Sequence, residues 1–93
     1  MKVRVIYKGY LTSLATKEEV VEVKEGATVQ DLLETLVKRY GPDFEYEVFD
    51  EGLIVKDYVW VRLDEKTVGR LDTSETKLSD SATLILFAFG PRC

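Results

Sequence analysis

The stretch "TVQDLLETLVKRYGP", Thr28 to Pro42, decides the fold because its apolar residues follow the period of a helix. These residues recur every three or four positions, so they lie on one face of an α-helix. Thr28 and Asp31 have the spacing of a capping box, and Gly41 followed by Pro42 favours a stop. The pattern predicts one main helix, about Val29 to Tyr40, whose apolar face carries Val29, Leu32, Leu33, Leu36, Val37 and Tyr40.

Two strands are predicted before this helix. "KVRVIYKG", Lys2 to Gly9, alternates between apolar and polar residues, which is typical of a half-buried strand. "EEVVEVKEG", Glu18 to Gly26, allows Val21 and Val23 to face the core, and a short turn containing Leu11 and Leu14 precedes it. The two strands suit a hairpin.

The segments after the helix show strand patterns of different strength. "DFEYEVFDEG", Asp43 to Gly52, is irregular, and it is interpreted as either a short strand or a loop. "YVWVRLD", Tyr58 to Asp64, alternates again. "TLILFAF", Thr83 to Phe89, is almost wholly apolar, which indicates a central strand that is covered on both faces or that exposes an apolar one.

This order of elements predicts the fold class α+β, as a ubiquitin-like β-grasp domain with a mixed sheet of four to five strands packed on one main helix. The first and last strands would pair in parallel at the centre of the sheet, which explains the apolar last strand. We expect residues 1–93 to form a single domain, with Gly90 to Cys93 as a flexible C-terminal tail because the tail has no large apolar side chain to anchor it.

Charge and composition limit the partners. A formal net charge of -4 argues against binding to nucleic acid or an anionic membrane. No apolar run reaches the roughly 18 residues of a membrane span, and the N-terminus lacks the pattern of a signal peptide. We therefore expect a cytoplasmic protein. Its single cysteine cannot form an internal disulfide, which agrees with that compartment.

The residue types argue against an autonomous enzyme. The chain has no histidine, the commonest general base and metal ligand near neutral pH, and one cysteine does not supply a zinc site. The carboxylates from Asp43 to Glu51 are interleaved with aromatic residues, which favours a solvated acidic loop over a calcium or acidic docking site. We predict no catalytic residue, no metal site and no cofactor.

The outer face of the sheet is the predicted binding surface. If one apolar set faces the helix, the alternation of a strand directs a second apolar set away from it. The set expected to face the helix is Val3, Val5, Val59, Val61, Leu84 and Leu86. A surface with Trp60 and Phe87 at its centre and a rim of basic residues is typical of a protein-binding site. The alternatives are a homodimer through the same face or its coverage by residues 43–57. The predicted site comprises Ile6, Trp60, Arg62, Ile85, Phe87 and Phe89, rimmed also by Lys2, Arg4 and Lys8.

Three stretches resemble the ThiS/MoaD group of β-grasp sulphur carriers, which includes the small subunit of molybdopterin synthase and the thiamin sulphur carrier. They are "VRVIYKGYLTSLA", "EGATVQDLLETLVKRY" and "LDTSETKLSDSATLILF". The resemblance covers nearly the whole chain, and "EGATVQDLL" is its most specific part. It implies a carrier without catalytic activity of its own. The implied partner is an adenylating, ubiquitin-activating-like enzyme or the large subunit of a cofactor synthase.

The resemblance also implies a working C-terminus, because family members end in two glycines whose carboxylate is adenylated and converted to a thiocarboxylate. Here Arg92 and Cys93 stand at those places. Three explanations stay open: a divergent member that no longer forms a thiocarboxylate, processing that exposes Gly90, or a persulphide on Cys93. The functional alternative is a ubiquitin-like interaction or regulatory module without sulphur chemistry. The tail, Gly90, Pro91, Arg92 and Cys93, therefore joins the outer face as a candidate site.

Overall fold

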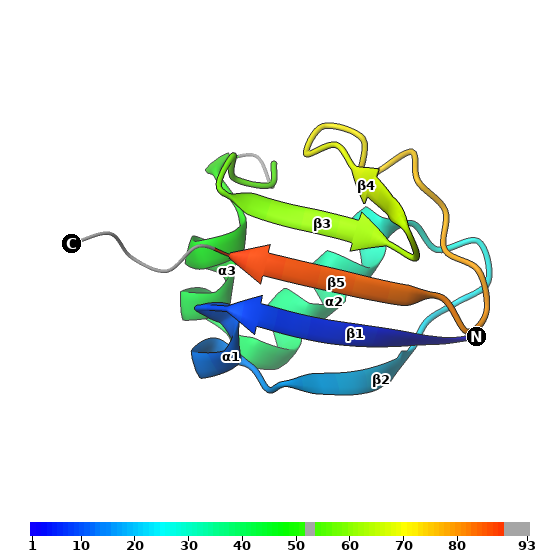
Figure 1. Ribbon diagram of the computed structural model, residues 1–93, viewed down its shortest axis with the longest axis horizontal. Coiled ribbons are helices and arrows are strands. Elements are labelled where there is room, and N and C mark those ends of the chain that lie inside the picture. The colour runs from blue at the N-terminus through cyan, green and yellow to red at the C-terminus, as the bar shows by residue number, and fades with distance from the viewer. Residues whose placement is uncertain (52–53, 89–93) are drawn as a thin grey trace.

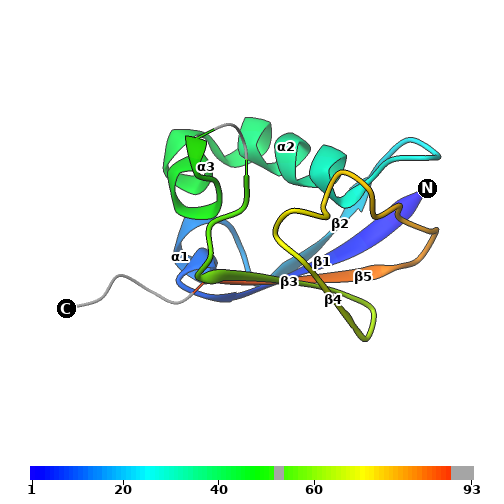
Figure 2. The same ribbon diagram turned by 90° about the horizontal axis from the view of Figure 1, so that it is seen from above.

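The computed structural model describes residues 1–51 and 54–88 and contains a five-stranded sheet in the order β2-β1-β5-β3-β4 (Figure 1). The helices all lie on one side of this sheet (Figure 2). The strands are β1 (Lys2–Gly9), β2 (Glu18–Glu22), β3 (Val59–Leu63), β4 (Lys66–Val68) and β5 (Thr83–Ala88). The helices are α1 (Leu11–Leu14), α2 (Val29–Tyr40) and α3 (Pro42–Val48).

Helix α2 confirms the prediction from the apolar period. The Thr28 hydroxyl accepts a hydrogen bond from the Asp31 backbone N–H at 3.2 Å, and the Asp31 carboxylate accepts one from the Thr28 N–H at 3.0 Å. This reciprocal capping box fixes the start of the helix. Gly41, with a φ of 92°, ends it. Leu32, Leu33 and Leu36 are fully buried, so the predicted apolar face is the face that packs on the sheet.

The strand pairing confirms the predicted mixed sheet with a parallel centre. β1 pairs antiparallel with β2 and parallel with β5. β5 also pairs antiparallel with β3, so the almost wholly apolar last strand is the middle strand of the sheet. The fifth strand, β4, pairs with β3 through a tight turn that the sequence did not reveal.

The interpretation of Asp43 to Gly52 as a strand or a loop is wrong for its first half, because Pro42–Val48 forms α3. Pro42 stands at the start of this helix, where its missing N–H has no consequence, and Asp43 favours the positive end of the helix dipole. Phe44 and Val48 lie four residues apart and are both fully buried. The turn expected around Leu11 and Leu14 is likewise a single helical turn, α1.

The core lies between the sheet and α2, α3 and α1. All the residues predicted to face the helix are at most 4% exposed, which confirms the strand register: Val3, Val5, Val59, Val61, Leu84 and Leu86. Side chains alternate between the two faces of a strand, so their neighbours lie on the opposite, outer face. No helix in residues 1–51 and 54–88 is long and apolar enough to span a bilayer.

Candidate functional site

The outer face of the sheet has no helix packed on it within the described part of the chain (Figure 2). The segment 43–57, considered as a cover for this face, contributes Phe44, Val48 and Val55 to the core instead. Its described residues therefore lie on the side of α2, and they do not cover the outer face.

Five of the six predicted site residues come together on this face in two neighbouring rows. In the first row, Ile6 of β1 lies beside Ile85 of β5, which lies beside Arg62 of β3. In the second row, Lys8 lies beside Phe87, which lies beside Trp60. Directly opposed residues on adjacent strands have their side chains on the same face, about 5 Å apart at Cβ. The sixth residue, Phe89, lies outside the described residues.

The centre of this face is an aromatic pair on adjacent strands. Trp60 is 61% exposed, the largest exposure of any aromatic residue on the sheet, whereas Phe87 and Ile85 are half-buried. Large, exposed aromatic side chains dominate binding energies at protein interfaces when a partner covers them. The face thus offers an anchor that the fold itself does not bury.

Four basic side chains surround the apolar centre of this face, although Glu18 and Glu22 of β2 also lie on it at the edge of the sheet. Lys2, Arg4 and Lys8 of β1 are exposed on it, as is Arg62 of β3. The Arg4 guanidinium lies 3.9 Å from the Glu18 carboxylate, and both side chains are more than half exposed, so this pair contributes little to stability. An apolar centre with a cationic rim suits a partner surface that carries carboxylates.

The end of β5 is fixed beside the end of β1, at the base of the predicted tail. The Tyr10 backbone N–H donates to the Ala88 carbonyl at 3.0 Å. Gly9 has a φ of 69°, and a Cβ built on it would lie 2.1 Å from the Ala88 carbonyl oxygen, so the two strands approach more closely than a side chain would allow. The predicted tail residues, Gly90, Pro91, Arg92 and Cys93, lie outside the described residues.

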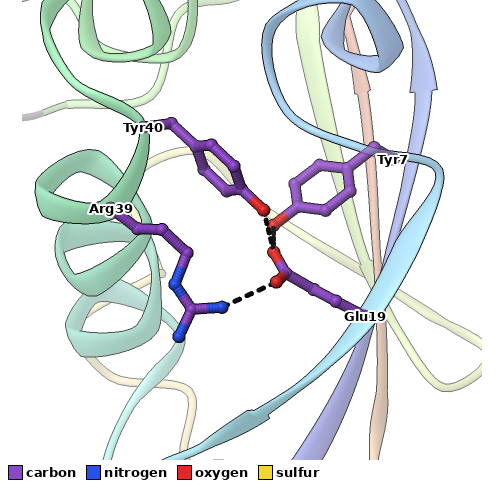
Figure 3. Close-up of polar contacts among 4 residues, drawn as sticks. All are labelled: Tyr7, Glu19, Arg39 and Tyr40. Carbon is purple, nitrogen blue, oxygen red and sulfur yellow. Dashed lines mark hydrogen bonds and ion pairs between the residues drawn. The ribbon is translucent and has the colours of Figure 1, made fainter.

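A polar cluster that the sequence patterns did not indicate lies on the helix side of the sheet, at the end of α2. The Glu19 carboxylate accepts hydrogen bonds from the Tyr7 hydroxyl at 2.6 Å, from the Tyr40 hydroxyl, and from Arg39 Nη1 at 2.6 Å (Figure 3). One feature of the sequence could have indicated this cluster. Glu19 lies two residues before Val21, so it shares the core-facing side of β2 although it is charged. The hydroxyl of a half-buried or buried tyrosine needs a partner, and this carboxylate supplies it.

The pKa values of Tyr7 and Glu19 are shifted in opposite directions in this cluster. Burial raises the pKa of Tyr7 far above its usual range, and the hydrogen bond to Glu19 raises it further. Burial opposes ionisation of Glu19, but the hydrogen bonds from Tyr40, Tyr7 and Arg39 outweigh it and lower the pKa of the carboxyl. Glu19 is therefore an ionised acceptor whose three hydrogen bonds join β2 to β1 and α2. This role is structural.

No group of three or more His, Cys, Asp or Glu side chains in the described ranges could hold a metal ion.

Comparisons with known proteins agree with the fold. A sequence model of the ThiS family matches residues 5–90. A protein assigned as molybdopterin converting factor subunit 1 from Pyrococcus furiosus is 33% identical, with a TM-score of 0.77 over 97% of this chain and 99% of that one. A search of curated proteins found no match.

Two further solved structures show likeness of fold alone. SAMP1 from Haloferax volcanii is 21% identical, with a TM-score of 0.84 over 100% of both chains. A chain of the BexX/CysO complex from Amycolatopsis orientalis is 19% identical, with a TM-score of 0.68 over 98% of this chain and 99% of that one.

Proposed function

The chain belongs to the ThiS family, and from this premise we propose that it is a carrier of the ThiS/MoaD type that docks through its outer sheet face and its C-terminal tail. Members of this family are small carrier proteins that are not themselves catalytic. The proposed partner is an adenylating enzyme or the large subunit of a cofactor synthase.

The observation that carries this proposal is the exposed aromatic centre on a sheet face that the helices leave open. Trp60 and Phe87 lie opposite each other on β3 and β5, and β5 leads directly to the tail. A partner that covers the aromatic pair would therefore lie close to the end of β5 at Ala88. The proposed docking face and the proposed tail are contiguous in sequence.

The similarity to a molybdopterin converting factor subunit supports a partner that belongs to cofactor synthesis. A chain of the BexX/CysO complex shares this fold and was solved in a complex, which agrees with a protein partner. The basic rim of Arg4, Lys8 and Arg62 supports a partner surface with carboxylates around an apolar centre.

The first experiment incubates the protein with ATP, candidate activating enzymes and a sulphur donor, either sulphide or a persulphide, and then weighs the intact chain. Replacement of one oxygen by sulphur would identify a thiocarboxylate, and addition of one sulphur a persulphide, which Cys93→Ser would abolish. Loss of a Pro-Arg-Cys fragment would identify processing at Gly90. A chain that binds a partner but never changes mass would instead be an interaction module without sulphur chemistry.

The second experiment tests the docking face with Trp60→Ala. We expect partner binding to weaken by about 2 kcal/mol or more, because the central aromatic anchors of an interface have effects of this size. The melting temperature should stay nearly unchanged, because Trp60 is 61% exposed. Binding is measured by titration calorimetry and melting by circular dichroism.

The matched control is Leu71→Ala, which truncates an apolar side chain that is 66% exposed but lies outside the sheet. This variant should bind the partner like the unmodified protein. Equal binding by both variants and the unmodified protein would remove the outer face from the proposal. A Trp60→Ala variant that melts like a core variant would show that the side chain supports the fold.

A further inference from the structure

Strand β2 forms one edge of the sheet, at the end opposite β4 (Figure 1). Among the described residues, only β1 pairs with it. A sheet edge presents backbone N–H and C=O groups in the geometry that another strand would bond, so such an edge is a template for strand addition.

The hydrogen-bond pattern shows which groups face the open edge. The Tyr7 N–H donates to the Lys17 carbonyl at 2.9 Å, and the Val23 N–H donates to the Met1 carbonyl at 2.8 Å. In an antiparallel pair, every second residue bonds to the neighbouring strand. The odd-numbered residues of β2 therefore bond to β1, and the N–H and C=O groups of Glu18, Val20 and Glu22 point outward.

The side chains of the same three residues are exposed on the outer side of the sheet. The exposed fractions are 55% for the Glu18 side chain, 73% for that of Glu22 and 57% for Val20. Glu18 lies 3.9 Å from Arg4, and Glu22 lies 3.8 Å from the N-terminal ammonium group. Both distances are long for an ion pair, and both carboxylates belong to side chains that are more than half exposed, so they stay available to a partner.

This charge pattern selects the kind of strand that fits the edge. In an antiparallel pair of two copies centred on Val20, Glu18 of each copy would lie opposite Glu22 of the other. Like charges directly opposite each other destabilise a strand pair, whereas opposite charges stabilise it. In this register a second copy is therefore disfavoured, and a strand with Lys or Arg at these two positions is favoured.

A groove beside the edge gives room for the other side chains of an added strand. It has a volume of about 590 Å³ and lies between the residues that end and follow β2 and the outer side of α2. Val23 and Ala27 line it together with Asp31 and Glu34 of α2. The carboxylates that line it outnumber the two lysines, Lys24 and Lys38, so the groove also favours a basic segment.

We propose that the open edge of β2 binds an extended segment of a partner protein by strand addition, in which an apolar residue lies opposite Val20 and Lys or Arg lies opposite Glu18 and Glu22. This site is distinct from the outer face around Trp60 and does not depend on the proposed carrier function.

The test titrates the isotopically labelled full chain with the end-blocked peptide Thr-Lys-Thr-Val-Thr-Lys-Thr and follows amide hydrogen exchange by NMR. We expect the amides of Glu18, Val20 and Glu22 to exchange fast in the free protein and to become protected as peptide is added. The amide of Val21, which already bonds to β1, should change little. The same peptide with an N-methylated valine lacks the central donor and should give no protection.

A charge swap tests the selectivity. Glu18→Lys together with Glu22→Lys should lower the affinity for the lysine peptide about tenfold or more, because two attractive cross-strand pairs become repulsive. This variant should bind the corresponding peptide with Glu in place of both Lys. The control, Glu45→Lys together with Glu65→Lys, makes the same charge change at exposed residues outside β2 and should retain the affinity of the unmodified protein.

Three results would overturn the proposal. Equal losses in both charge variants would show general attraction to an acidic protein. Shifts confined to Trp60 and its neighbours, without protection of the β2 amides, would place the peptide on the outer face. Protection of the β2 amides that rises with protein concentration in the absence of peptide would identify a second copy as the occupant.

Discussion

Glu19 shows how one side chain can join three elements. It extends from β2 and accepts hydrogen bonds from Tyr7 of β1 and from Arg39 and Tyr40 of α2 (Figure 3). The Tyr7 and Tyr40 rings also pack edge to face, with their centroids 6.0 Å apart. The carboxylate therefore satisfies two hydroxyls that would otherwise lie beside apolar side chains.

We expect Glu19→Gln to lower the free energy of unfolding at neutral pH by about 1–3 kcal/mol, because charge-assisted hydrogen bonds at a largely buried acceptor are lost. Urea denaturation provides the measurement. The matched control is Glu18→Gln on the same strand, because the Glu18 side chain is 55% exposed and lies 3.9 Å from the Arg4 guanidinium. A loss of equal size in both variants would contradict the role assigned to Glu19.

The pH dependence of this difference follows from the lowered pKa of Glu19. The unfolded carboxyl titrates near its ordinary pKa of 4.5, and the folded one titrates below it. The stabilisation is fully present above the unfolded pKa and is lost as the pH falls through the folded pKa. The stabilities of the protein and its Glu19→Gln variant should therefore converge in acid, and a constant difference would argue against this assignment.

At the scale of elements, the backbones of β1 and β5 lie in close contact where the strands end, at Gly9 and Ala88. A residue with a Cβ pays roughly 1–2 kcal/mol for the left-handed backbone conformation of Gly9. We expect Gly9→Ala to lower the free energy of unfolding by more than this, because its Cβ would also lie 2.1 Å from the Ala88 carbonyl oxygen. Gly26→Ala is the control, since Gly26 has a φ of 84° but no atom within 4 Å of the added Cβ. Equal unfolding free energies for the two variants would show that the strand contact is unimportant.

The elements differ in how far the sequence predicts them. Helix α2 has a capping box, a long apolar period and a glycine stop, so local signals specify both its ends. Helix α3 has only two turns, and its two buried apolar residues, Phe44 and Val48, do not establish a period by themselves. The three residues of β4 are too few for alternation to indicate a strand.

The candidate sites were likewise predictable only where the pattern within a single segment was sufficient. Alternation along single strands was sufficient to place Ile6, Trp60 and Ile85 on the outer face. The Glu19 cluster depends on how β2 lies relative to α2, which is a tertiary relation. The open edge at Val20 depends on which strand ends the sheet, so sequence patterns within β2 could not reveal it.

For the whole molecule, the sheet is both the support of the core and the proposed binding surface. One face buries Val5, Val61 and Leu86 against the helices. The other face exposes Trp60, and the edge at β2 exposes backbone groups. The two proposed contacts therefore use different chemistry, which is aromatic burial on the outer face and backbone hydrogen bonding at the β2 edge. Two partners could bind at once where they extend away from the protein in different directions.

We expect a chain that ends at residue 82 to lose cooperative unfolding, because it lacks β5. The truncation removes the strand that joins β1 to β3 and deletes Leu84, Leu86 and Ala88 from the core. Full burial of a leucine side chain contributes about 1.5–3 kcal/mol, and native domains are stable by only about 5–15 kcal/mol.

The measurement is thermal unfolding followed by circular dichroism, and a chain ending at Ala88 is the control. The control retains every described strand and should unfold in one transition. A single sharp transition in the shorter chain would show that the remaining strands form a stable sheet without their centre.

The central position of β5 has a consequence for protein synthesis. The Lys2 backbone N–H donates to Asp80, 78 residues later, and the parallel pairing of β1 with β5 begins just beyond that point. A ribosome makes β1 early, but the neighbour that covers its inner edge is the last strand to be made. Until β5 leaves the exit tunnel, the nascent chain exposes an unpaired edge to chaperones and to other nascent chains. The sheet of this domain can therefore close only after β5 has left the ribosome.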